Sequence, residues 1–341
     1  MKTLFIVSPQ EDYLADSLLM GMRELLGHDC VDFPKAEVLY KNHQFDKNYL
    51  LYGRGFTLYS GLLPDLDIDR FRIQEKVRSN FFDLIIFGNI WSQFGFFTQM
   101  RPWLTSRNTI IIDGADTPQP YPAAGLWWRR PYYWFLPRAH RNFLYFKREW
   151  TPDTRFTLAS RFIPGALKNR LPQARNLHPI SFSIPAEKIV TELPVKKKDF
   201  PKHIVDPDVV KHVRDSATSY AFEDEQDYYN DLQISRFGIT TKRSGWDCLR
   251  HYEIAANAAV PCFKDLHKKP DTCAPHGLNK SNCIPYRSAT ELFARIESLS
   301  DTEYRSLQLN ALAWVKQQTT EVRARQVLAV FEQNRLVSDG K

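Results

Sequence analysis

The sequence lacks long hydrophobic runs and has few cysteines, and each shortage excludes a class of protein. No run reaches the ~18 apolar residues that a membrane-spanning helix needs, so no such helix is expected. The chain begins MKTLFIVSPQED, whose apolar stretch is too short for a secretory signal, and we expect a first strand there. The five cysteines form no Cys-x-x-Cys pair and are odd in number, which favours reduced thiols in a cytoplasmic protein.

Metal-binding patterns are also missing. Cys273 and Cys283 lie near His267 and His276, but their spacing fits no usual zinc site. No Asp-x-Asp pair follows a buried strand, and the acidic residues at 65, 67 and 69 lie in an expected loop. We therefore expect no bound metal and no resident cofactor.

Length and composition indicate a globular protein with two domains. The chain has 341 residues, of which 43% are hydrophobic and 25% charged. Single cores stop growing near ~250–300 residues, so two domains are expected. Pro-rich residues 160–202 mark the crossover, and we place an N-terminal domain at 1–180 and a C-terminal domain at 181–320. A last helix, 321–341, is expected to cross back to the first domain.

The first domain shows strands that alternate with helices. Residues 4–7, 82–88 and 109–114 are apolar with little polar alternation, which is typical of parallel strands covered on both faces. Helices are expected at 12–26, 68–80 and 100–105, and a further strand at 30–33. This alternation predicts a doubly wound, Rossmann-like α/β sheet, which binds ligands at the carboxyl ends of its strands.

The second domain is expected to repeat this pattern. Short strands are predicted at 203–205, 220–222, 239–241, 260–263 and 282–286. Helices are predicted at 207–217, at 225–233, from 249 onward, and as one helical region over 289–334. The predicted fold class is therefore α/β, with two Rossmann-like domains facing a cleft.

The most informative stretch is 239–263, ITTKRSGWDCLRHYEIAANAAVPCF, which reads as strand, basic loop, helix and strand. Backbone N–H groups in such a loop, together with the helix N-terminus, form a natural anion site, and Lys242 and Arg243 add charge there. Arg250 and Glu253 are three residues apart and share one helix face. A cation and a carboxylate at one site suit a nucleoside diphosphate sugar, with Arg on the pyrophosphate and Glu on the ribose.

The runs GWDCLRHYE (245–253) and ANAAVP (256–261) resemble the donor-binding segment of GT-B glycosyltransferases. The likeness is greatest to exostosin-like and spore-coat-type bacterial and phage members. In that family an Arg-x-x-Glu on a helix, a small-residue turn and a strand that begins with Pro hold the nucleotide. The turn usually carries Gly, whereas Ala258 and Ala259 stand here. The resemblance implies a GT-B fold, metal-independent hexosyl transfer and a nucleotide-sugar co-substrate, with a UDP-sugar favoured. The residues expected to bind the donor are Lys242, Arg243, Ser244, Gly245, Trp246, Arg250 and Glu253.

A base for the acceptor hydroxyl is expected from the first domain, across the cleft. Asp113 and Asp116 follow one buried strand and Asp12 follows another, so all three are catalytic candidates. Each of them could equally be a turn or cap carboxylate.

Residues 118–155 combine eleven aromatic side chains with seven Lys or Arg and only two acidic residues, which leaves +5 of the chain's net charge of +7 in one segment. Aromatic rings among arginines suit a sugar, a nucleic acid or an anionic membrane surface. Trp127, Trp128, Arg129 and Arg130 are the acceptor-binding candidates. The alternative is a folded subdomain whose aromatic residues form its core.

The sequence thus favours a glycosyltransferase that moves a sugar from a nucleoside diphosphate to a hydroxyl of a glycan, a surface polymer or a modified nucleic acid. Two alternatives remain open. One is a phage-type DNA glucosyltransferase acting on a hydroxymethylated base, and the other is a non-catalytic protein that binds nucleotide sugars or nucleic acid. Peripheral contact with a membrane is compatible with each.

Overall fold

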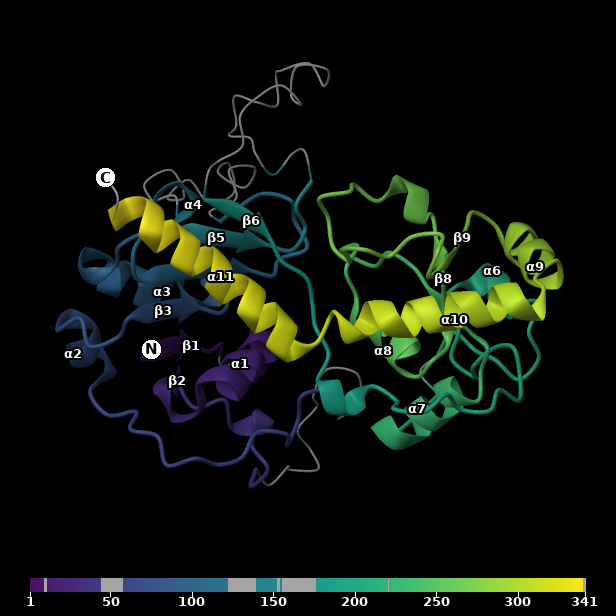
Figure 1. Cartoon of the computed structure of the whole chain (residues 1–341), viewed down its shortest axis with the longest axis horizontal. Helices are drawn as coiled ribbons and strands as arrows, with labels where there is room; N and C mark the ends of the chain where they lie inside the picture. The colour runs from purple at the N-terminus through teal and green to yellow at the C-terminus, as the bar shows by residue number, and fades with distance from the viewer. Residues whose placement is uncertain are drawn as a thin grey trace, which may run out of the picture.

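The computed structural model describes residues 1–8, 11–43, 58–121, 139–151, 154, 176–219 and 221–339. Two parallel sheets lie side by side, with the larger sheet at the left of Figure 1 and the smaller at the right. We call each sheet with its helices the N-terminal half and the C-terminal half. Within the described ranges, none of the helices combines the length and the hydrophobicity needed to span a bilayer.

The larger sheet has six parallel strands in the order β2-β1-β3-β4-β5-β6. The strands are β1 (Thr3–Ile6), β2 (Cys30–Phe33), β3 (Leu84–Phe87), β4 (Thr109–Asp113), β5 (Leu144–Lys147) and β6 (Leu177–Pro179). The register aligns Thr3 of β1 with Cys30 on one side and Leu84 on the other. The predicted strands at 4–7, 30–33, 82–88 and 109–114 are therefore confirmed.

Both faces of this sheet are buried, which explains its uninterrupted apolar strands. Side chains alternate between faces along a strand, so Phe5 and Val7 join one core cluster while Leu4 and Ile6 join another. The covering helices are α1 (Tyr13–Leu26), α2 (Ile73–Arg78), α3 (Ile90–Met100) and α4 (Ala139–Asn142). The short helix expected at 100–105 is a 3-10 helix at Arg101–Trp103, and the longer α3 that precedes it at Ile90–Met100 was not predicted. Asn89 caps that earlier start with its side chain.

The C-terminal half contains a three-stranded parallel sheet in the order β7-β8-β9. Its elements are α6 (Pro207–Val210), α7 (Glu225–Gln233), β7 (Phe237–Thr240), α8 (Leu249–Ala256), β8 (Val260–Lys264), β9 (Ile284–Tyr286), α9 (Ala289–Glu297) and α10 (Asp301–Lys316). The second sheet is therefore smaller than expected among the described residues. Residues 203–205 contribute only a single bridge, His203 to Ala217, rather than a strand. The helix predicted over 207–217 ends at Val210, and β-branched valines are weak helix formers. Residues 221–222, expected as a strand, have no regular structure.

The turn after α8 bears on the small-residue pair noted in the sequence. Ala258 has a φ of 54°, in the left-handed region where glycine is usual at a helix C-terminus. Its Cβ is fully buried, and its carbonyl accepts a hydrogen bond from Gln308 Nε2 at 2.9 Å. Alanine therefore stands at a position whose backbone conformation favours glycine.

The chain crosses twice between the halves, and the two crossings are hydrogen bonded to each other. Ile184 N donates to Gln318 O at 2.9 Å, and Thr320 N donates to Ile184 O at 3.0 Å. After the second crossing, α11 (Thr320–Asp339) lies along α1, so the C-terminal helix returns to the N-terminal half (Figure 1). The helical region expected over 289–334 is three helices, and Ser300 with Glu303 forms a capping box that starts α10. The domain boundaries drawn from the sequence stay a prediction.

The contact between α1 and α11 depends on Gly21. A Cβ at this position would lie 2.0 Å from the carbonyl oxygen of Thr320, so the helices can meet only without a side chain there. We expect Gly21→Ala to lower the free energy of unfolding by about 1–3 kcal/mol, because overpacking forces the backbones apart. Urea denaturation of the two proteins measures this difference.

Gly95 in α3 is the matched control. A Cβ there would meet nothing within 4 Å, so Gly95→Ala should stabilise the chain by roughly 0.5–1 kcal/mol through the better helix propensity of alanine. Equal unfolding midpoints for Gly21→Ala and Gly95→Ala would contradict the tight packing of α1 on α11.

Candidate functional site

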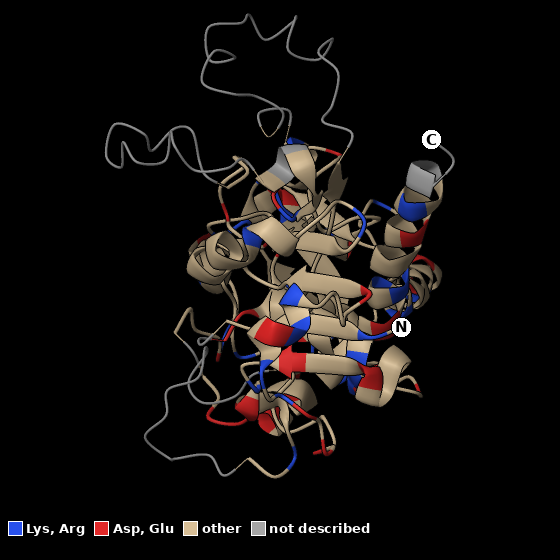
Figure 2. Cartoon of the chain, turned by 90° about the vertical axis from the view of Figure 1, so that its left-hand side faces the viewer, with Lys and Arg blue, Asp and Glu red and all other residues tan. Residues whose placement is uncertain are grey.

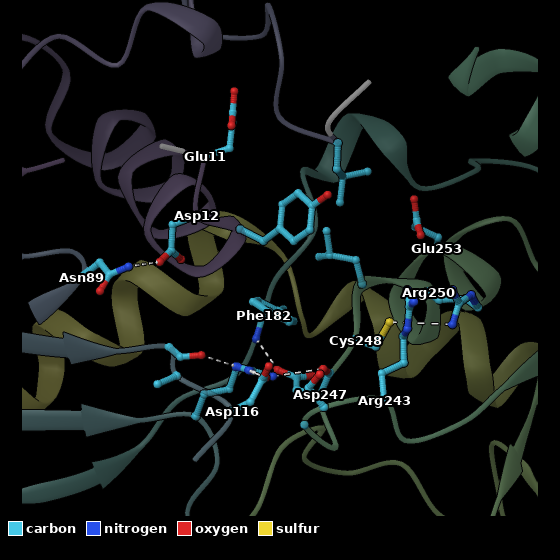
Figure 3. A pocket seen from close by; sticks show the side chains of 18 of the residues that line it. Glu11, Asp12, Asn89, Asp116, Phe182, Arg243, Asp247, Cys248, Arg250 and Glu253 are labelled. Carbon is cyan, nitrogen blue, oxygen red and sulfur yellow. Dashed lines mark hydrogen bonds and ion pairs between the residues drawn. The ribbon is translucent and has the colours of Figure 1, made fainter. Parts of the chain in front are cut away.

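A cavity of about 550 Å³ lies where the carboxyl ends of both sheets face each other. This is the position at which open α/β sheets bind ligands. In Figure 3, Glu11, Asp12 and Asn89 lie on one side and Arg243, Arg250 and Glu253 on the other. The further lining residues are Ser8, Tyr13, Leu58, Ser92, Gly114, Ala115, Asp116, Arg148, Phe182, His203, Tyr228, Ser244, Gly245, Asp247, Cys248 and Leu249.

Two helix caps build the N-terminal side of the cavity. Asp12 Oδ1 accepts hydrogen bonds from the N–H groups of Leu14 and Ala15 at 3.0 and 3.1 Å and so caps α1. Asn89, the cap of α3, donates from Nδ2 to Asp12 Oδ2 at 2.6 Å. Burial raises the pKa of Asp12, while these hydrogen bonds act in the opposite direction. Asp12 therefore starts a helix and also presents a carboxylate to the cavity.

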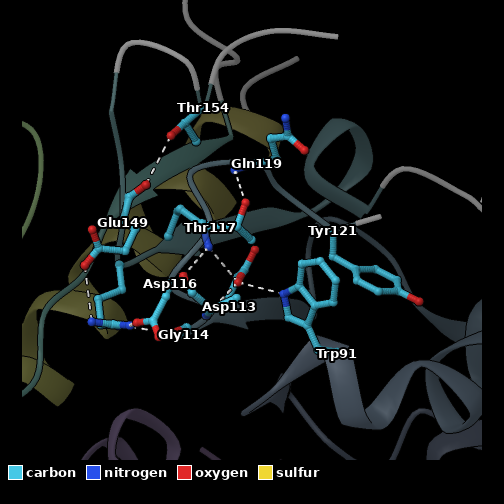
Figure 4. A network of polar contacts seen from close by, with 12 residues as sticks. Trp91, Asp113, Gly114, Asp116, Thr117, Gln119, Tyr121, Glu149 and Thr154 are labelled. Atoms are coloured by element: carbon cyan, nitrogen blue, oxygen red, sulfur yellow. Dashed lines mark hydrogen bonds and ion pairs between the residues drawn. The ribbon is translucent and has the colours of Figure 1, made fainter. Parts of the chain in front are cut away.

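Asp113 lies inside the protein rather than on the cavity surface. Its carboxylate accepts four hydrogen bonds, from Trp91 Nε1, Ala115 N, Lys147 Nζ and the Tyr145 hydroxyl. Figure 4 shows the Trp91 side chain directed at this carboxylate. The carboxylate and the Lys147 ammonium are both fully buried and 2.8 Å apart, and burial lowers the pKa of Lys147. This geometry favours a structural role for Asp113 over the base expected from the sequence.

Asp116 does reach the cavity. It lies three residues beyond the end of β4, and its side chain is 48% exposed. Its Oδ1 pairs with Arg148 Nη2, which leaves Oδ2 for a ligand or water. Asp12 and Asp116 are thus the two catalytic candidates that line the cavity.

Arg148 and Glu149 are the site residues that sequence reasoning did not single out. They follow β5, and only 3% of each is exposed. Arg148 Nε donates to Gly114 O at 3.0 Å and its Nη1 donates to Asp247 O at 3.0 Å, so it joins β4 to the C-terminal half. Their position directly after an apolar strand was the available signal, because residues at such ends meet at one edge of a parallel sheet.

The basic loop expected to bind the donor divides into two parts. Arg243 and Ser244 are exposed and line the cavity with Gly245. Lys242 and Trp246 do not line it: the Lys242 ammonium lies 5.1 Å from the centre of the Trp246 ring, and that ring packs in the core. Core packing therefore accounts for Trp246.

Arg250 and Glu253 extend from α8 into the cavity, on the side that carries Arg243 (Figure 3). The Tyr229 hydroxyl donates to Glu253 Oε1 at 3.3 Å. Burial raises the pKa of Glu253 to about 7, Arg250 opposes this rise, and Glu225 adds to it. His203 also lines the cavity, and burial lowers its pKa, with Arg250 and Arg243 acting in the same direction.

Two buried residues of the same segment are structural. His251 Nε2 is 2.9 Å from Trp246 O and its Nδ1 is 2.7 Å from Thr240 Oγ1, while burial lowers its pKa to about 3. His251 is therefore neutral and holds the loop. Asp247 accepts from Phe182 N and from the Tyr252 hydroxyl, each at 2.8 Å, and burial raises its pKa to about 6. Its bond with Phe182 attaches the loop to the first crossing segment.

The expected anion site at the loop's backbone needs a correction. The N–H groups of Trp246 and Asp247 donate to Glu149 Oε1 at 2.8 and 3.2 Å. A carboxylate of the N-terminal half thus occupies the amides that the sequence offered to a phosphate. These two amides are therefore already paired, whereas the side chains of Arg243, Ser244 and Arg250 line the cavity.

The acceptor candidates Trp127, Trp128, Arg129 and Arg130 lie outside the described residues. Part of the basic aromatic segment is nevertheless visible, and it is internal: Lys147 and Arg148 are buried and paired with Asp113 and Asp116. Figure 2 shows Lys and Arg interspersed with Asp and Glu over the N-terminal half. The charge of 118–155 is therefore not all on a surface that faces a partner.

Comparison with known proteins bears on the fold. No protein-family model matches the chain, and no curated protein matches it in sequence. Among solved structures, HepE of Anabaena, solved with UDP and glucose, matches with a TM-score of 0.55 and 12% identity over 97% of this chain and 99% of that one. The chain shares its fold with glycosyltransferases. A glycosyltransferase of Rickettsia africae matches with a TM-score of 0.53 and 9% identity over 97% and 98% of the two chains. HepE solved with UDP-glucose gives a TM-score of 0.53 and 11% identity.

The raised pKa of Glu253 predicts how stability depends on pH. The folded state favours the protonated form, so the stability due to this group is full below its unfolded pKa near 4.5 and is lost as the pH rises through about 7. Glu253→Gln stays neutral, so its stability relative to the wild type should rise between pH 5 and 8, by on the order of 1–3 kcal/mol. Urea denaturation across this pH range measures the difference. A difference that does not change with pH would refute the raised pKa.

Proposed function

We propose that this protein is a glycosyltransferase of GT-B architecture that moves a sugar from a nucleoside diphosphate to an acceptor hydroxyl. One observation carries the proposal. Arg243 and Arg250, with the carboxylate of Glu253, line one side of a 550 Å³ cavity whose other side carries Asp12 and Asp116. A diphosphate suits the arginines, ribose hydroxyls suit Glu253, and the opposite carboxylates suit an acceptor hydroxyl.

The proposed donor is a UDP-sugar. Its support is the shared fold with HepE, which was solved with UDP-glucose, and the position of Arg250 and Glu253 on α8 at the carboxyl edge of the smaller sheet. The pyrophosphate would contact Arg243 and Arg250. Glu253 would accept from the ribose, next to the hydroxyl of Tyr229.

The proposed base is Asp116 or Asp12. Asp116 is half exposed and paired with Arg148, and a carboxylate held in this way suits the orienting of a hydroxyl. Asp12 is less tied to a cation and has a raised pKa, which brings it closer to the range of a general base.

The described cavity lining gives no support to a nucleic-acid acceptor. On the N-terminal side it presents Glu11, Asp12 and Asp116, whose charge would repel a polyanion, and its one cation, Arg148, is paired. We therefore favour a hydroxyl of a glycan or surface polymer. The roles of Trp127, Trp128, Arg129 and Arg130 in acceptor binding stay a prediction.

Donor binding is tested with UDP and UDP-glucose by calorimetry. Arg250→Ala and Glu253→Ala should each weaken UDP binding by roughly 1.5–3 kcal/mol, because each removes a charge-assisted hydrogen bond. The matched control is Arg295→Ala. Arg295 is an exposed arginine of α9 in the same half, it pairs with Glu303, and it does not line the cavity. Unchanged affinity in both cavity variants would remove the assignment of the donor site. Absence of binding to the wild type would remove the proposed donor.

We also propose that transfer needs no divalent metal. The two carboxylates that follow β4 are each paired with a cation, Asp113 with Lys147 and Asp116 with Arg148. Among the described residues, no group of three or more His, Cys, Asp or Glu is arranged to hold a metal ion. Release of UDP from UDP-glucose in the presence of acceptor should continue in excess EDTA. Its loss in EDTA and its return with Mn²⁺ or Mg²⁺ would show the opposite.

A further inference from the structure

The loop that carries the proposed donor residues is held by the opposite half of the molecule. Glu149 Oε1 accepts from Trp246 N at 2.8 Å and from Asp247 N at 3.2 Å. Its other oxygen, Oε2, accepts from Cys273 Sγ at 3.2 Å. Each of these contacts joins Glu149, two residues beyond the end of β5, to the C-terminal half. We call residues 242–248 the donor loop.

Neighbouring side chains strengthen the same junction. Arg148 Nη1 donates to Asp247 O at 3.0 Å and to Glu149 Oε1 at 3.2 Å. Glu149 is only 3% exposed and Asp247 5%, so water does not compete for these hydrogen bonds. A buried carboxylate paired in this way stabilises one conformation of the loop, because any other conformation removes the two backbone N–H donors of Trp246 and Asp247 from it.

Gly245 gives independent evidence of how closely the loop approaches. A Cβ at 245 would lie 2.5 Å from Glu149 Oε1 and 2.8 Å from Asp116 Oδ1. Both atoms belong to the N-terminal half. The loop can therefore sit against Glu149 and Asp116 only because this position has no side chain.

One side of the donor loop faces the cavity, and Glu149 contacts the loop from the side that faces away from the cavity. Arg243, Ser244 and Gly245 line the cavity, and Arg250 follows within the first turn of α8, but Glu149 is not a lining residue. A change at Glu149 therefore reaches a bound donor through the residues that Glu149 contacts, which include the donor loop and Arg148.

We infer that Glu149 is a positioning residue, which orders the donor loop from the opposite half and thereby places Arg243 and Arg250 for the diphosphate. The role in donor binding rests on the proposed function, whereas the ordering of the loop does not. Because the same carboxylate joins the two halves, the order of the loop and the closure of the cavity are coupled. Loss of the carboxylate should loosen both without removing any group that contacts the donor.

Two variants test this inference by different routes. Glu149→Gln keeps the shape of the side chain and removes its charge, while Gly245→Ala pushes the loop away and leaves Glu149 intact. Hydrogen exchange of the peptide covering 242–248, in the protein without ligand, should become about tenfold faster or more in both variants, because local opening no longer breaks the charged hydrogen bonds. UDP affinity should fall by about fivefold or more, because part of the binding free energy is then spent on ordering the loop. A tenfold change in affinity corresponds to about 1.4 kcal/mol.

Arg250→Ala separates positioning from direct contact. It should weaken UDP binding while exchange of the donor loop stays at the wild-type rate. Glu303→Gln is the matched control, because Glu303 also accepts a backbone N–H, that of Ser300 at 3.0 Å, but does so within the C-terminal half and away from the cavity. It should leave both exchange and affinity unchanged.

The outcomes distinguish this inference from the proposed function. Wild-type exchange in folded Glu149→Gln and Gly245→Ala would overturn the positioning role, even if UDP binds. Faster exchange with unchanged UDP affinity would also overturn it, because the order of the loop would then not matter to the donor. If the wild type binds no UDP, the proposed function fails, and the exchange rates alone decide whether Glu149 orders the loop.

Discussion

The candidate site depends on buried charges at the carboxyl end of β5. Lys147, Arg148 and Glu149 are consecutive, buried and paired with three different parts of the molecule. Lys147 neutralises Asp113 inside the large sheet, Arg148 holds Asp116 at the cavity, and Glu149 holds the donor loop. A buried charge without a partner would cost several kcal/mol, so each of these side chains stabilises a particular arrangement of its surroundings. One short segment thereby sets the geometry of both sides of the cavity.

The junction between the halves is polar near the cavity and apolar beyond it. One continuous apolar cluster includes Leu18 of α1, Tyr252 of α8 and Val327 of α11, so it extends across both halves. Apolar contacts are not directional and allow small shifts, whereas the hydrogen bonds of Arg148, Glu149 and Asp247 fix distances. This separation of apolar from polar contacts suits a protein in which packed helices hold two halves together. A few polar contacts then define the relative position of the two sides of the cavity.

The charges on the cavity's described lining are also divided between the halves. The cations Arg243 and Arg250 come from the C-terminal half, and the carboxylates Glu11, Asp12 and Asp116 from the N-terminal half. Three lining residues depart from this division: Arg148 of the N-terminal half, and Asp247 and Glu253 of the C-terminal half. Arg148 is paired with Asp116, and burial raises the pKa of Asp247 to about 6 and that of Glu253 to about 7. Such an arrangement attracts an anionic ligand to one side and a neutral, hydroxyl-bearing ligand to the other, in agreement with the proposed transfer.

The sequence by itself determined the parallel strands of the large sheet, because strands buried on both faces must be apolar throughout, as at 84–87 and 110–112. It also determined that Arg250 and Glu253 share a helix face, since their spacing is local. Only the tertiary structure decided which carboxylates reach the cavity. Asp113 and Asp116 are both aspartates at the end of the same strand, and the sequence does not distinguish them. Asp113 is buried because it pairs with Lys147, which lies far from it in the chain. The tertiary structure likewise decided that the amides of Trp246 and Asp247 bind Glu149, about a hundred residues earlier in the chain. Local sequence patterns carry no information on which distant side chain contacts a loop.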